Sequence, residues 1–175
     1  YQLLNEAAKD RLGGLHSAKI LLYSVDFFEI EALMSRGEWD RAADLLGDVA
    51  LRLQQAGADC VLICTNTLHK VAPQVQSQLS VPLLHIAEAA AEALLARGVT
   101  RVGLLGTKYT MTQEFYRDKL VARGVEVIIP DEDEIELVNR VIFDELCLGI
   151  VKDDSRAAYL RVIDNLKSRG AEAIL

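Results

Sequence analysis

Short, nearly continuous apolar runs alternate with longer amphipathic stretches along this chain of 175 residues, and this alternation restricts its fold most strongly. Such runs are typical of strands covered on both faces, and they occupy residues 18–25, 60–65, 81–84, 101–105, 125–129 and the stretch from 172 onward. Helical patterns cover residues 3–12, 29–36, 39–55, 68–78, 87–97, 111–123, 134–146 and 155–169. This βαβ rhythm predicts an α/β protein with doubly wound, mostly parallel sheets.

A weak internal repeat suggests that the chain has two similar halves. The sequence Gly-Ala-Asp-Cys-Val-Leu at 57–62 and the sequence Gly-Ala-Glu-Ala-Ile-Leu at 170–175 each follow an amphipathic helical pattern. We therefore expect two α/β lobes, residues 1–97 and residues 98–175, with the first lobe also able to receive a later segment of the polypeptide.

Composition and charge exclude several classes of protein. Nineteen Lys and Arg against 26 Asp and Glu give a net charge of −7, which argues against nucleic-acid or membrane-surface partners. No apolar run approaches the roughly 18 residues of a membrane span. The odd set of three cysteines predicts a reducing, cytoplasmic location rather than a disulfide framework. The isolated histidines and the lack of a Cys-x-x-Cys pair predict no metal site.

The segment Cys64-Thr65-Asn66-Thr67 stands where a predicted strand ends and a helical pattern begins. Ligands of open α/β sheets bind at this edge, where backbone N–H groups and polar side chains can hold an anion. Two alternatives stay open, namely that a threonine only caps the helix and that Cys64 is a small core residue. His69 is either an anion-binding or a structural residue.

A second segment of the same kind joins a predicted strand to a helix at residues 104–111. Gly103 and Gly106 do not complete a dinucleotide-binding fingerprint, so no such cofactor is expected. Thr110 is a candidate helix cap, with Gln113 three residues later. Neither a Walker loop nor a Gly-x-Ser-x-Gly elbow occurs, which argues against phosphoryl transfer and serine hydrolysis.

Three segments together resemble the aspartate/glutamate racemase family: ADCVLICTNTLHK at 58–70, RVGLLGTKYTM at 101–111 and IFDELCLG at 142–149. The resemblance covers the whole chain. It implies two pseudo-symmetric α/β lobes, a homodimer, and interconversion of L- and D-aspartate or glutamate without any cofactor. Family members begin with a further strand and end with a Gly-Cys-Thr-Glu motif, so we expect a piece of a longer polypeptide that lacks both.

The chain departs from the family pattern at one position. Most members carry a cysteine immediately before Asn-Thr, whereas this chain has Thr65 there and Cys64 one residue earlier. Alternation along a strand predicts that Cys64 points into the core, which leaves it the less favoured catalytic candidate. The resemblance implies that Thr65 serves one face of the substrate and that a cysteine beyond residue 175 serves the other as thiolate base.

The resemblance also implies the residues that bind the amino acid, which are Asn66, Thr67, Thr107 and Thr110. The nearest cations in the sequence are Lys108, His69 and Lys70. An asymmetric pair of threonine and cysteine is expected to favour one enantiomer. Two other functions stay open on this architecture: a lyase similar to arylmalonate decarboxylase, and a protein that binds an amino acid without turnover.

Overall fold

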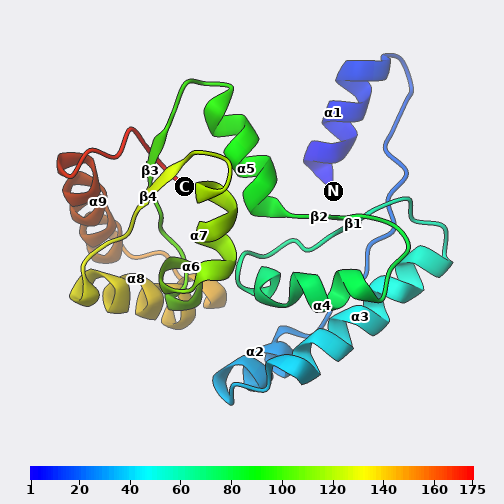
Figure 1. The fold of residues 1–175 in the computed structure, drawn as a ribbon, viewed down its shortest axis with the longest axis horizontal. Helices are drawn as coiled ribbons and strands as arrows, with labels where there is room; N and C mark the ends of the chain where they lie inside the picture. Colours follow the sequence, from blue (N-terminus) through cyan, green and yellow to red (C-terminus); the bar gives the residue numbers. More distant parts are fainter. The chain divides into compact units, whose positions relative to one another are not determined.

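The computed structural model describes residues 1–175 as helices joined by short parallel strands (Figure 1). The α-helices are α1 Gln2–Leu12, α2 Phe27–Ser35, α3 Trp39–Gln55, α4 Ala72–Ser77, α5 Ile86–Leu95, α6 Lys108–Thr112, α7 Glu114–Val121, α8 Glu132–Asp144 and α9 Asp153–Ser168. The strands are β1 Val61–Leu62, β2 Leu83–Leu84, β3 Arg101–Gly103, β4 Glu126–Ile128 and β5 Ala173–Ile174. Two 3-10 turns, η1 Thr67–Val71 and η2 Leu146–Leu148, complete the secondary structure. No helix is long and apolar enough to cross a membrane.

The chain divides into two compact units, each with its own contacts. Unit 1 consists of residues 1–61 and 74–82, and unit 2 of residues 62–73 and 83–175. These units are defined by contacts, whereas the lobes 1–97 and 98–175 rest on the sequence repeat and stay a prediction.

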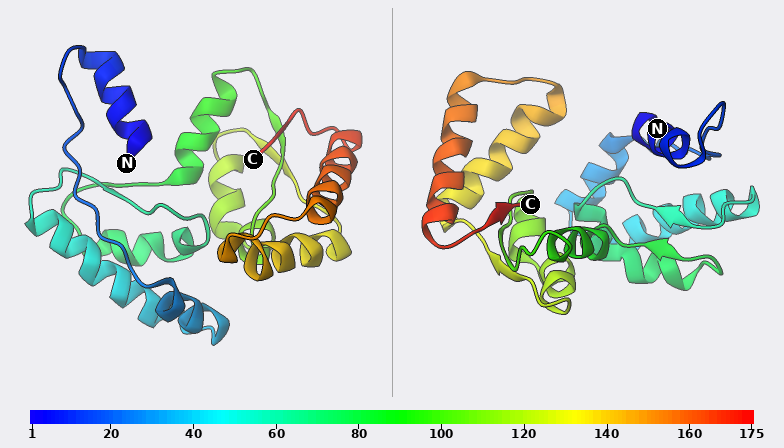
Figure 2. Two further views of the ribbon diagram at one scale, coloured as in Figure 1. Left: turned by 180° about the vertical axis from the view of Figure 1, so that it is seen from behind. Right: turned by 90° about the horizontal axis from the view of Figure 1, so that it is seen from above.

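Unit 2 is built on a three-stranded sheet in the order β4-β3-β5. Both pairings of β3 are parallel, with Val102 opposite Val127 of β4 and opposite Ala173 of β5. One cluster of buried side chains joins β3 to α5 and α7, and a second cluster joins α6, α8 and α9. Helices therefore cover both faces of a parallel sheet (Figures 1 and 2), and the predicted doubly wound α/β class is confirmed.

Four helices lead to a strand through the same glycine turn. At Gly57 the N–H donates to Gln54 O at 2.9 Å and the next N–H, of Ala58, donates to Leu53 O at 3.1 Å. Both bonds recur at Gly98, Gly124 and Gly170, and all four glycines have positive φ. This is the Schellman motif, in which a left-handed residue satisfies the last carbonyls of a helix. The two copies of the sequence repeat thus share their local structure.

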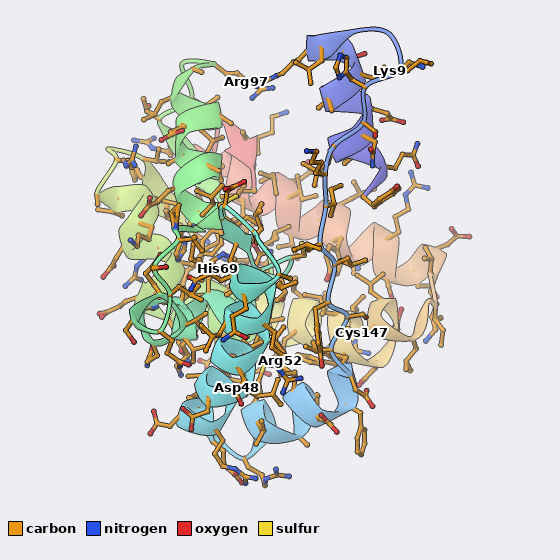
Figure 3. The ribbon with its side chains drawn as sticks, turned by 90° about the vertical axis from the view of Figure 1, so that its right-hand side faces the viewer. Lys9, Asp48, Arg52, His69, Arg97 and Cys147 are labelled. Carbon is orange, nitrogen blue, oxygen red and sulfur yellow. The ribbon has the colours of Figure 1, made fainter.

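In unit 1, α2 packs against α3 through small and branched apolar side chains. Asp26 begins α2 by accepting a hydrogen bond from the Phe28 N–H at 3.0 Å. The opposite side of α3 is polar, and Asp48 and Arg52, both exposed and one turn apart, are labelled there in Figure 3. The predicted span of α3, residues 39–55, is confirmed.

The expected strand at 18–25 does not form, because this segment pairs with no other strand. An apolar run becomes a strand only when a neighbouring chain segment completes its hydrogen bonds. The helical patterns at 68–78 and 111–123 are each interrupted. The first begins as the 3-10 turn η1, and the second breaks at Gln113, whose backbone is extended with φ −95 and ψ 154.

We expect Gly103→Ala to lower the free energy of unfolding by about 1–3 kcal/mol, the usual cost of overpacking a core. Gly103 is buried in the middle strand, and a Cβ there would lie 2.7 Å from Ile174 Cδ1 and 2.9 Å from Leu166 Cδ1. Urea denaturation followed by circular dichroism measures the change.

Gly47→Ala is the matched control, because it adds the same methyl group inside α3. The atoms nearest to the added Cβ would be those at the end of the Gln78 side chain, which is exposed and free to move. Replacing a mid-helix glycine by alanine then raises stability by up to about 1 kcal/mol. Equal effects of the two substitutions would contradict the packing assigned to Gly103.

Candidate active site

Two loops of unit 2 that follow strands are joined by a hydrogen bond between threonine side chains. We call residues 63–67, which follow β1, the first site loop, and residues 104–110, which follow β3, the second site loop. Thr67 Oγ1 of the first lies 2.8 Å from Thr107 Oγ1 of the second. Thr67 is buried, whereas Thr65 and Asn66 are exposed.

Thr107 organises the second site loop. Its side chain caps α6, with Oγ1 accepting from the Thr110 N–H at 3.3 Å. The hydroxyl of Thr110, a residue that is 1% exposed, lies 3.2 Å from the same Oγ1. The expectation that Thr110 caps the helix is therefore wrong, because the chain turns into helix three residues earlier. The hydroxyls of Thr67, Thr107 and Thr110 form one continuous chain.

The first site loop presents Thr65 and Asn66 at the surface. Asn66 occupies the position before η1, so neither threonine of this loop serves as the cap of this turn. The Asn66 side chain itself makes no capping bond. Cys64 is exposed. The expectation that Cys64 points into the core is wrong, because β1 ends at Leu62 and strand alternation does not continue to residue 64.

His69 lies one turn beyond the first site loop and is 1% exposed (Figure 3). Its Nε2 accepts from the Ile86 N–H at 3.2 Å, so Nδ1 carries the proton and donates to Thr65 O at 2.7 Å. Burial lowers the pKa of His69, although the backbone carbonyls partly oppose the shift. The histidine is therefore neutral and both ring nitrogens are occupied, which favours the structural reading of this residue over anion binding.

His85 lies against His69 at the start of α5. The two rings meet edge to face with centroids 4.5 Å apart, and His85 Nδ1 caps α5 by accepting from the Ala87 N–H at 3.2 Å. Burial and repulsion from His69 and Lys119 lower the pKa of His85 to about 4, against a weaker opposing effect of Glu88. The sequence patterns did not single out His85, although a polar residue directly before a helical pattern is a signal for a cap.

The expected cations are differently placed. Lys108 forms an ion pair with Glu136 of α8, and this hydrogen-bonded contact raises the pKa of the lysine. The Lys108 backbone N–H donates to Asn139 Oδ1 at 2.8 Å. Lys70 is half-buried, which lowers its pKa. The second site loop is thus fastened to α8 through Lys108.

A cavity of about 200 Å³ lies between the end of α8 and the start of α9. Glu145, which is 4% exposed, accepts from Ser155 Oγ at 2.7 Å and lies 3.4 Å from Lys152 Nζ. The hydrogen bond from Ser155 holds the pKa of this carboxyl below its usual value. Sequence patterns do not predict this cavity, although the segment 142–149 places two acidic residues, Asp144 and Glu145, among apolar ones.

Comparison with known proteins assigns the chain to a family. The family model for Asp/Glu/Hydantoin racemase matches residues 1–175. The chain belongs to this family, and the resemblance seen in the sequence is confirmed.

Related proteins agree with this assignment. A crystal structure from Yersinia pestis, provisionally assigned as an Asp/Glu racemase, is 51% identical with a TM-score of 0.90, over 99% of this chain and 76% of that one. An aspartate racemase homologue from Pyrococcus horikoshii is 34% identical with a TM-score of 0.79, over the same shares. The broad specificity amino-acid racemase RacX of Bacillus subtilis is 33% identical over 95 residues, which are 54% of this chain and 41% of that protein.

We expect Thr107→Ala to lower the free energy of unfolding by about 1–2 kcal/mol, because it removes a helix cap and a partner of the buried Thr67 hydroxyl. Thr107→Ser keeps the hydroxyl and is expected to stay within about 0.5 kcal/mol of the wild type. Chemical denaturation compares the three proteins. Similar stability of the alanine and serine variants would contradict the role given to the hydroxyl.

Stability is also expected to depend on pH through His85. The unfolded chain binds a proton on this histidine below pH about 6.5, whereas the folded chain does so only near pH 4. The contribution of neutral His85 to the free energy of unfolding is therefore complete above pH about 6.5 and falls as the pH is lowered towards 4.

Urea denaturation at pH 7 and pH 5 measures this loss. His85→Asn, which can still accept the capping hydrogen bond but does not titrate, is expected to lose less stability over the same interval. A variant that follows the wild-type dependence would show that other groups cause it.

Proposed function

We propose that the protein is a cofactor-independent amino-acid racemase acting on aspartate or glutamate. The observation that carries the proposal is the hydrogen bond between Thr67 and Thr107, which brings together the two site loops of a chain that belongs to the Asp/Glu/hydantoin racemase family. Exposed Thr65 and Asn66 stand next to this chain of hydroxyls. The name of the RacX relative supports amino acids as the substrate class.

The proposed reaction needs groups that hold negative charge while a proton leaves the α-carbon. Neutral donors that are already oriented stabilise such charge well in a site sheltered from water. Asn66, Thr67, Thr107 and Thr110 are proposed to bind the substrate. Thr107 Oγ1 accepts from the Thr110 N–H, and its own hydroxyl proton can be donated to the hydroxyl of Thr67 or Thr110 or to a substrate carboxylate.

Thr65 is proposed to exchange a proton with the α-carbon on one face of the substrate. A cysteine beyond residue 175 is proposed to do so on the opposite face. A thiolate can abstract a proton near neutral pH, whereas a threonine hydroxyl donates one far more readily than it accepts one. The site is therefore asymmetric and favours one enantiomer as the substrate for abstraction. Cys64, which is exposed and adjacent to Thr65 in the sequence, is the less favoured alternative to Thr65 as the reacting group on this face. A homodimer and a cytoplasmic location complete the proposal.

Proton exchange in D2O is the test. We expect the intact protein to replace the α-proton of aspartate or glutamate by deuterium, seen as loss of the α-proton NMR signal, faster for one enantiomer. Thr65→Ala is expected to lower the rate by about 100-fold, in the range of a general acid–base group. Thr65→Ser keeps the hydroxyl and is expected to retain most of the activity.

Cys64→Ser is the matched control at the neighbouring position. If it abolishes exchange while Thr65→Ala does not, Cys64 is the reacting group. Release of carbon dioxide from an arylmalonate would instead identify a lyase. Saturable binding of an amino acid by folded protein, without exchange of either enantiomer, would identify a binding protein and overturn the proposal.

A further inference from the structure

We propose that His69 is a positioning residue that sets the conformation of the first site loop and thereby the place of Thr65. This inference rests on the proposed function, since it concerns the residue that the proposed reaction uses. His69 is buried and is not proposed to touch the substrate. It acts through the backbone that carries Thr65 and Asn66.

The first site loop has two successive carbonyl groups that are both bound by His69. The imidazole Nδ1–H donates to Thr65 O at 2.7 Å, and the His69 backbone N–H donates to Asn66 O at 3.0 Å. Residues 63–66 belong to neither a helix nor a strand, so no regular hydrogen-bond ladder orders them. The exposed Thr65 side chain therefore depends on its own backbone for its position.

The other side of the imidazole is anchored to α5. Nε2 accepts from the Ile86 N–H at 3.2 Å, and the next N–H of the helix, from Ala87, is accepted by His85. The rings of His69 and His85 pack edge to face. Because the first turn of α5 supplies both donors, His69 connects the segment after β1 to the segment after β2. A ring held by hydrogen bonds at both nitrogens and packed against a second ring has little freedom to tilt.

The surrounding charges are paired with one another. Glu88 of α5 accepts from Lys119 Nζ of α7 at 2.7 Å, and Arg123 Nη2 lies 3.7 Å from the same carboxylate. Lys119 and Glu88 shift the pKa of His85. The hydrogen-bond partners of His69 are all backbone groups, and these alone oppose the effect of burial on its pKa. A neutral imidazole with a defined tautomer is thus the resting state of this connection.

Two substitutions by amide side chains can remove the two hydrogen bonds of the imidazole one at a time. The Asn side chain places its N–H₂ group near the position of Nδ1, so His69→Asn can keep the bond to Thr65 O and lose the one to Ile86. The Gln side chain reaches the position of Nε2, so His69→Gln can keep the bond from Ile86 and lose the one to Thr65. Both variants lose the imidazole ring and its contact with His85.

The test compares kcat and KM for α-proton exchange in the intact wild-type protein and the two variants, with folding checked by circular dichroism. We expect His69→Gln to lower kcat by about 10-fold or more, the effect of a small misplacement of a reacting group. We expect His69→Asn to stay within about 3-fold of the wild type. Equal losses in both variants, or full kcat in the glutamine variant, would overturn the proposal.

Amide NMR provides a second readout that does not require activity. We expect the signals of Thr65 and Asn66 to shift or broaden in His69→Gln and to stay in place in His69→Asn, whereas the Ile86 amide exchanges faster only in His69→Asn. An inactive wild type with this pattern would refute the proposed reaction and support the positioning role. Unchanged loop signals in His69→Gln would refute the positioning role whatever the activity.

Discussion

The site of unit 2 depends on one strand, β3, that forms hydrogen bonds along both of its edges. The ladder continues past the assigned strand, since the Leu104 N–H donates to Ile128 O and the Leu105 N–H donates to Leu175 O, each at 2.9 Å. Gly106 follows directly and Thr107 caps α6. Thr107, whose hydroxyl meets that of Thr67, therefore stands two residues beyond Leu105, the last residue of this ladder. Close packing of Ile174 and Leu166 against Gly103 also holds β3 in place.

The sequence predicts those features that are governed by local or periodic rules. Helix α3 and the glycine turns at Gly57 and Gly170 follow from amphipathic spacing and from the left-handed conformation that glycine permits. The expected strand at 18–25 fails because pairing depends on a partner that an apolar run does not specify. The same limit applies to Cys64, since alternation predicts direction only for as long as a strand lasts.

Within the site, residue types are predictable and their partners are not. Thr107 and Thr110 were both visible as hydroxyls after a glycine, but which one caps α6 depends on where the backbone turns. His69 could be read as anion-binding or structural, and only its contacts with Thr65 and Ile86 distinguish these readings. The tautomer of His69 follows from the Ile86 N–H, which donates to Nε2 from another segment of the chain. No rule of sequence spacing predicts such a contact.

The glycine turns and the two site loops lie at opposite ends of their strands. The Schellman turns precede β1, β3, β4 and β5, and the site loops follow β1 and β3. Substitutions in the loops therefore leave the turns that build the sheet untouched. The proposed site can therefore change by substitution while the glycine turns keep the architecture. The two site loops are the positions to randomise in a directed-evolution library.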